Sequence, residues 1–415
     1  MEESGVEAFD RLSNLPIPII HHIMSFLPTT DATRVTILSK KLNFVSQSYP
    51  ILDFDEPLYN NRLSFSRGKL VSFLDFMQHS LKRCTSNFSS TQKFRLCFIV
   101  QHANKPNKRI NKSICFPMHN LRELVLKVIV ESVPDYYFLM FAKKITPMSI
   151  VVLNLEGFEF KFEDMIPSLT SVEDLTLEDC HVSSNFSISS AKLKTLRLWG
   201  CEGLENIMID VFNLQSFSLF NPTSSSEINI VDGKSSKNLV LHNITITDDW
   251  LEDLVSKPLL LENRSISSGF LKEIKICHRQ LKSFTLLNCD KFVKAENIEA
   301  PKLIAFDYKI RPGTFFPVIT LLCSSWAHSK LSLCVDSPTS DEWFMNLKNF
   351  LCYIFWPFLN VIVNFRWWGI SFLEFHSLCI LCLLILFYYI YNILVILLLY
   401  SLQITFFSVC DIFRN

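Results

Sequence analysis

The sequence predicts an α/β protein in three parts: a small three-helix domain, a repeat solenoid with a curved parallel sheet, and a hydrophobic helical tail. Three observations support this division. Apolar residues recur at helical spacing within the first 56 residues, and a strand-like leucine pattern returns every 21 to 29 residues from residue 121. No charged residue occurs from 377 to 410.

The first predicted helix carries one wide apolar stripe. Its members fall at i, i+1, i+4, i+7 and i+8 and are preceded by two further leucines: Leu12, Leu15, Ile19, Ile20, Ile23, Phe26 and Leu27. Pro16 and Pro18 suit a helix start, where a missing N–H would have no partner in any case, and Pro28 ends the helix.

Two more helices are expected after Pro28. Thr29 or Thr30 is the expected N-cap of the second helix, with Asp31 in its first turn, and Ser39 is the expected cap of the third. A segment of this length lies near the lower size limit for independent folding, where chains of about 40 residues usually need a disulfide, a metal or a partner. We therefore expect part of the apolar stripe to face another protein.

Four motifs in this segment occur in order: LSNLP, IIHHIMSFLPT, DATRVTILSKK and YPILDFDE. Together they resemble the F-box of the large family of plant F-box and leucine-rich-repeat proteins. An ordinary amphipathic helical hairpin is the alternative interpretation. The family usually has a Trp and an Arg after its Ser-Lys-Lys or Ser-Lys-Arg, whereas Leu42 and Asn43 stand here. This departure predicts a weaker third helix and a lower affinity for the partner.

The resemblance implies that the F-box binds a SKP-type adaptor, which links it to a cullin scaffold and a RING subunit. The candidate adaptor-facing and supporting residues are Leu12, Leu15, Pro16, Ile19, Ile20, Ile23, Phe26, Leu27 and Pro28.

Composition limits the function classes. The 40 basic and 40 acidic residues give a net charge of zero, which argues against a nucleic-acid-binding protein. The N-terminus MEESGVEAFD has no apolar core of a secretory signal, so a cytoplasmic or nuclear location is expected. In such a reducing compartment the 13 cysteines should be mostly free thiols.

The repeat pattern is L-x-x-L-x-L, as in leucine-rich repeats. Clear copies begin at Leu121, Ile150, Val172, Leu193 and Leu214. Weaker copies are Leu239 with Leu241, then Leu271, Ile274 and Ile276, then Leu281, Phe284 and Leu286, and a last strand is expected at Leu303 and Phe306. Each unit should supply one short strand whose alternate residues enter a shared core, because one repeat cannot bury its apolar edge alone.

Three cysteines recur in the same place in the repeat. Cys180, Cys201 and Cys289 each lie three residues beyond the last apolar strand position, where a small side chain can pack beneath the strand and contact backbone groups. A zinc site would need paired ligands two to four residues apart, which this spacing does not provide. The pattern therefore favours a structural role over a metal site.

Catalytic and cofactor motifs are absent from the sequence. Only nine glycines occur, without GxGxxG or a P-loop, and neither HExxH nor GxSxG is found. The sequence therefore predicts no catalytic residue, no metal and no cofactor.

The tail has two competing explanations. Its apolar run exceeds the roughly 20 residues that cross a bilayer, so 377–400 is a candidate transmembrane segment through which the chain would be anchored to a membrane. Alternatively, its bias toward Phe, Leu, Ile, Tyr and Val, which have T-rich codons, indicates translation of a non-coding segment in an aberrant gene model.

The expected divisions are a disordered N-terminus (1–9), the F-box (10–56), a linker with a first irregular repeat (57–120), leucine-rich repeats (121–310), a C-terminal cap region (311–351) and the hydrophobic tail (352–415). The resemblance implies a non-catalytic, substrate-recognition subunit of an SCF-type ubiquitin ligase whose repeats bind an unknown protein substrate. The alternatives are a tail-anchored interaction protein without a ligase role, or an inactive product of an aberrant gene model.

Overall fold

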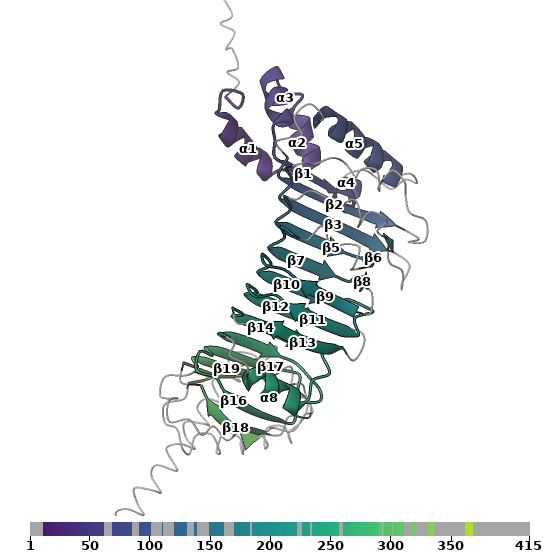
Figure 1. The fold of residues 1–415 in the computed structure, drawn as a ribbon. Helices are drawn as coiled ribbons and strands as arrows, with labels where there is room; N and C mark the ends of the chain where they lie inside the picture. The colour runs from purple at the N-terminus through teal and green to yellow at the C-terminus, as the bar shows by residue number, and fades with distance from the viewer. Residues whose placement is uncertain are drawn as a thin grey trace, which may run out of the picture.

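A computed structural model shows three short helices at one end of a tall stack of parallel strands (Figure 1). It describes residues 11–61, 69–84, 91–100, 110, 120–130, 137–138, 149–161, 170–182, 185–221, 226–232, 235–256, 260–289, 291, 294–300, 302–310, 318–319, 330–335 and 362–367. Small N-terminal helices followed by a series of parallel strands are consistent with an α/β leucine-rich-repeat solenoid.

The three N-terminal helices are α1 (Ile17–Ser25), α2 (Thr29–Val35) and α3 (Lys40–Gln47). Pro16 and Pro28 occupy the N-cap positions of α1 and α2. The Oγ of Ser39 accepts a hydrogen bond from the backbone N–H of Leu42 at 3.1 Å, so the predicted cap of the third helix is confirmed.

The predicted threonine cap of α2 is wrong. Thr29 is the first helical residue, and no side chain caps this helix. The Thr29 hydroxyl instead donates to the backbone carbonyl of Asp53 and accepts from the Asp53 N–H at 3.2 Å. Because Asp53 lies in the first strand, the threonine ties the second helix to the solenoid.

The main sheet has thirteen strands within the described residues, and every neighbouring pair is parallel. In spatial order they are β1 (Ile51–Asp55), β2 (Lys93–Val100), β3 (Glu123–Val130), β5 (Val152–Glu156), β7 (Asp174–Glu178), β10 (Thr195–Trp199), β12 (Ser216–Phe220), β14 (Asn238–His242), β15 (Asn263–Ile266), β17 (Ser283–Leu287), β19 (Ala305–Ile310), β21 (Lys330–Val335) and β22 (Ile362–Trp367).

Return segments form three smaller parallel sheets. These are β4 (Tyr137–Phe138), β6 (Phe158–Phe160) and β8 (His181–Val182); β9 (Asn185–Ser189), β11 (Asn206–Asp210) and β13 (Glu227–Asp232); and β16 (Glu273–Cys277), β18 (Lys294–Glu299) and β20 (Val318–Ile319). Further helices among the described residues are α4 (Glu56–Asn61), α5 (Lys69–Cys84) and α8 (Asp248–Ser256).

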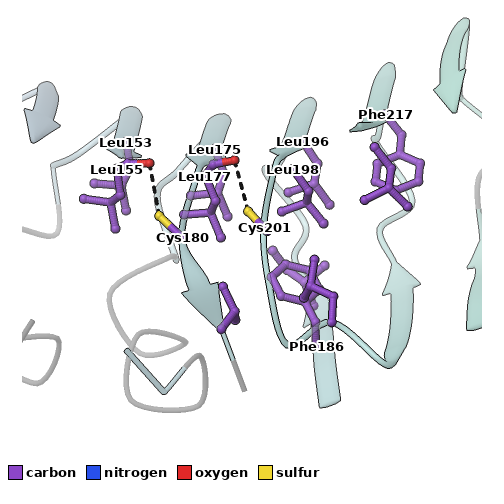
Figure 2. Packing of buried hydrophobic residues seen from close by; sticks show 14 of the residues in the cluster. Leu153, Leu155, Leu175, Leu177, Cys180, Phe186, Leu196, Leu198, Cys201 and Phe217 are labelled. Atoms are coloured by element: carbon purple, nitrogen blue, oxygen red, sulfur yellow. Dashed lines mark hydrogen bonds between the residues drawn. The ribbon is translucent and has the colours of Figure 1, made fainter. Parts of the chain in front are cut away.

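The leucine positions of the repeats form a continuous core between the sheets. Strands β5 and β7 show the same alternation of half-buried and buried residues, and the clear copies predicted from the sequence place their leucines inside it. Figure 2 shows Leu153, Leu155, Leu175, Leu177, Leu196 and Leu198 stacked from one repeat to the next. Each repeat thus buries the apolar edge of its neighbour.

A left-handed corner follows many strands of the main sheet. The residue directly after the strand has a positive φ in six repeats: Gly157, Asp179, Gly200, Asn221, Asn243 and Asn288. The N–H of Gly200 donates to the Phe220 carbonyl in the next strand at 2.7 Å. Gly, Asp and Asn are the residue types that adopt this conformation most readily. Their shared position is not visible in the leucine pattern of the sequence.

The repeat cysteines lie beneath the strands and contact backbone carbonyls. Cys180 donates its thiol to the Leu155 carbonyl at 3.4 Å, and Cys201 makes the equivalent contact with Leu177, also at 3.4 Å (Figure 2). The structural role predicted for these two residues is therefore confirmed. Burial raises the pKa of the Cys201 thiol to about 12 and that of Cys180 well above its ordinary value.

We expect Cys180 and Cys201 to resist alkylation in the folded chain, because the thiolate is the reactive form and burial disfavours it. Iodoacetamide labelling followed by peptide mass spectrometry should find both thiols unmodified at pH 7 and fully modified after unfolding in urea. Labelling of either cysteine in the native chain at the rate of the unfolded sample would contradict this packing.

The sequence-based prediction assigned one repeat strand to the wrong sheet. Residues 273–277, expected to form a main-sheet strand with Ile274 and Ile276, form β16 in a smaller sheet. The main-sheet position is taken by β15, which the leucine pattern did not predict because Arg264 stands in register with Leu239 and Phe284. Arg264 is buried where the neighbouring repeats have apolar residues.

The C-terminal part differs from the expected helical tail where it is described. Residues 362–367 form β22, which pairs with β21, so the prediction of a helix is wrong for these six residues. The candidate transmembrane segment 377–400 lies outside the described residues. Among the residues that are described, no helix is long and apolar enough to cross a membrane.

Candidate functional site

The three N-terminal helices pack around a small core of their own. It consists of Ile20, Met24, Ala32, Leu42 and Val45, and it is separate from the core of the solenoid. Leu42 is only 1% exposed and fills this core. Leu42, which stands where the family usually has a Trp, therefore leaves α3 formed, capped and packed.

The predicted adaptor-facing residues divide into three groups. Ile20 is buried in the small core, and Leu12, Leu15 and Leu27 are half-buried against it, so these four support the domain. Pro16 and Pro28 begin the first two helices, and Pro28 is half-buried.

The remaining three candidates, Ile19, Ile23 and Phe26, are exposed on one stripe of α1 and its C-cap. Sequence reasoning missed four other exposed apolar side chains of this domain. Together the seven form the exposed apolar set: Ile17, Ile19, Ile23, Phe26, Ile37, Leu38 and Phe44. Phe26 is 73% exposed and Ile37 is 82% exposed. Large apolar side chains exposed in such number on a small domain are typical of a protein that binds a partner through them.

The helical domain and the solenoid share a strand. β1 follows α3 directly and forms the first strand of the main sheet, paired with β2. Arg95 on β2 contacts the carboxylate of Asp53 at 3.0 Å and that of Asp55 at 3.2 Å. The carboxylate of Glu56 accepts a hydrogen bond from the N–H of Ile99 at 2.7 Å. These contacts fix β1 and the start of α4 to β2 at the end of the repeat stack.

The open face of the main sheet is lined by polar side chains that pair between neighbouring strands. Lys93 on β2 lies 2.7 Å from Glu123 on β3, and Arg197 on β10 lies 2.9 Å from Asp174 on β7. Lys127 pairs with Glu156 in the same way. These pairs place opposite charges on neighbouring strands of the open face.

The molecule thus has two regions, a helical domain with exposed apolar side chains and a repeat solenoid, an architecture typical of an interaction protein. Comparison with known families identifies the first region: residues 12–54 match the F-box domain. The chain therefore carries an F-box domain followed by parallel repeats, as the sequence motifs predicted.

Related proteins have the same combination. An F-box/LRR-repeat protein of Arabidopsis thaliana is 30% identical over 51% of this chain and 41% of its own length. F-box/LRR-repeat protein 25 of Arabidopsis thaliana is 27% identical over 47% of this chain and 70% of its own length. An F-box/FBD/LRR-repeat protein of the same plant is 23% identical over 70% of this chain and 58% of its own length.

These relatives support a plant F-box/LRR family for the chain. The chain spans less than two thirds of the length of two of them, 41% of the first F-box/LRR-repeat protein and 58% of the F-box/FBD/LRR-repeat protein. No solved structure matches the chain.

Proposed function

We propose that the protein is the substrate-recognition subunit of an SCF-type ubiquitin ligase. In this proposal the F-box binds a SKP-type adaptor, and through it a cullin and a RING subunit, while the repeats bind a protein substrate. The observation that carries the proposal is the F-box match at 12–54, combined with the exposed apolar set on the same helices. The subunit would act in the cytoplasm or nucleus.

Such a subunit performs no chemistry of its own. Its contribution is to hold substrate lysines near a charged ubiquitin-conjugating enzyme, which converts an encounter between two molecules into a step within one complex. The shared strand β1 supports this role because it fixes the F-box relative to the repeat face.

We expect Phe26→Ala to weaken adaptor binding by about 30-fold, because removing a buried aromatic anchor from an interface typically costs about 2 kcal/mol. Phe26 can supply such an anchor since it is 73% exposed in the unbound chain. The dissociation constant for a purified SKP-type adaptor, measured by biolayer interferometry, checks this expectation.

The matched control is Phe212→Ala, which removes an exposed ring beyond β11, outside the F-box. It should leave adaptor affinity unchanged. A version ending at Leu351 is measured in parallel with the full chain. If both versions fail to bind the adaptor, the ligase proposal is wrong, and if only the full chain fails, the tail interferes.

A second candidate is a tail-anchored interaction protein without a ligase role. The uncharged run from 377 to 410 favours it. Alkaline extraction of membranes separates the two, because an anchored chain stays in the membrane pellet. Transcript sequencing across the codons for Phe350 to Tyr353 tests the third alternative, an aberrant gene model, since a major transcript that reads straight through would exclude it.

A further inference from the structure

Four neighbouring strands of the main sheet end in a row of outward side chains. Glu178, Trp199, Phe220 and His242 are the last residues of β7, β10, β12 and β14, and they are aligned by the sheet register. We call these four residues the aromatic row. The ring centroids of Trp199 and Phe220 are 6.4 Å apart, and those of Phe220 and His242 are 4.9 Å apart.

Two of the three rings of this row are exposed to solvent, and His242 is half-buried. Trp199 is 41% exposed and Phe220 is 37% exposed. His242 is held in place by a 2.7 Å hydrogen bond between its Nε2 and the Ser265 hydroxyl. Adjacent large rings on the open face of a sheet form an apolar strip, which is the kind of surface that supplies binding energy in protein interfaces.

Glu178 gives the aromatic row a preference for cationic ligands. Its neighbours on the same face are paired, Lys127 with Glu156 and Arg197 with Asp174. Glu178 has no ion-pair partner in the part of the chain that the structure describes. Partial burial, followed by the nearby charges of Glu156 and Asp179, raises the pKa of Glu178, and the charge of Lys127 offsets only part of this rise. A further cation placed beside this carboxylate would stabilise its charged form.

We propose that the aromatic row is the docking site for a basic and apolar segment of the protein substrate, with a Lys or Arg between Glu178 and Trp199 and an apolar side chain on Phe220. This inference rests on the proposed function, because it specifies what the repeat face captures. The cation contacts a carboxylate on one side and the best of the cation-binding rings on the other. An acidic segment or a nucleic acid would be repelled by the same carboxylate.

The size of the row fits a short peptide. Neighbouring strands lie about 4.8 Å apart, so four strands span about 14 Å, which is the length of roughly four extended residues. A Lys or Arg side chain and a following apolar side chain can therefore contact the row together. Two such residues in a short segment define the recognised pattern.

The test uses a phage-displayed library of random 12-residue peptides, panned against the immobilised full chain. Enriched peptides should carry a Lys or Arg within two residues of an aromatic or aliphatic residue. Synthetic copies, measured by fluorescence anisotropy, should bind Trp199→Ala and Glu178→Gln each at least about fivefold more weakly than the unaltered chain. Phe212→Ala and Glu205→Gln, which alter exposed side chains outside the row, should bind them normally.

Peptides without excess positive charge, an absence of enrichment, or equal binding to Trp199→Ala and Phe212→Ala would each overturn the docking site. Adaptor affinity of the same preparations separates this inference from the proposed function. Adaptor binding without peptide binding defeats only the docking site. Peptide binding without adaptor binding defeats the ligase proposal and leaves the docking site standing.

Discussion

Replacing Arg264 with methionine is expected to stabilise the fold by about 3 kcal/mol at pH 7. Arg264 is 2% exposed in the core, in register with Leu239 and Phe284. None of its three guanidinium nitrogens has a hydrogen-bond partner among the residues described. A buried cation without a partner is unfavourable, and methionine fills a similar space with an unbranched, uncharged side chain.

The magnitude follows from the pKa of Arg264. Burial lowers it from its ordinary value to about 10, and each pKa unit corresponds to about 1.4 kcal/mol. Because the folded chain binds this proton less tightly than the unfolded chain, the charge destabilises the fold fully below about pH 10 and progressively less as the pH rises above that value. At pH 7 the whole cost is present, and the methionine variant removes it.

Urea unfolding followed by circular dichroism measures this difference. Arg279→Met is the matched control, because Arg279 is exposed and the same substitution should change the unfolding free energy by less than about 0.5 kcal/mol. A loss of stability in Arg264→Met would show that the guanidinium is paired with a group outside the described residues.

Replacing Gly157 with alanine is expected to destabilise the fold by about 2 to 4 kcal/mol. Gly157 forms the left-handed corner after β5 with a φ of +80°. An added Cβ would lie 2.2 Å from the backbone carbonyl oxygen of Val128. Both the left-handed conformation and this close approach penalise any side chain, and the backbone of β3 must shift to relieve the contact.

Gly269→Ala provides the control for this substitution. No atom lies within 4 Å of a Cβ added there, so its unfolding free energy should stay within about 1 kcal/mol of the original. The urea midpoints of the two variants are compared under identical conditions. Equal midpoints would mean that the corner after β5 tolerates a side chain, and the close packing of successive repeats at this corner would then be wrong.

The sequence predicted the parts of the fold that depend on a periodic apolar pattern. The leucines of β5, β7, β10, β12 and β14 enter the core as expected. Strand β15 escaped prediction because Arg264 breaks the pattern at a position that sheet register still requires. The left-handed corners escaped it because Gly, Asp and Asn share a backbone conformation without sharing a side chain.

Prediction of the F-box site from helical spacing has a similar limit. Helical spacing found the stripe of Ile19, Ile23 and Phe26, but it also included Ile20, which the other two helices cover. Ile37 and Leu38 follow the last residue of α2, where helical periodicity no longer applies. Their exposure of 82% and 69% emerges only when the three helices are packed.

The shared strand β1 sets a fixed distance between the F-box and the aromatic row. The aromatic row begins at β7, four strand spacings from β1 in the sheet order, or on the order of 20 Å along the stack. The five strands from β1 to β7 are hydrogen-bonded to one another in a continuous sheet, so a bound substrate would be presented at one distance and one orientation. Adding or deleting one repeat between β1 and β7 would shift the substrate by about 5 Å. Relatives that bind the same segment with different repeat numbers would then modify different lysines.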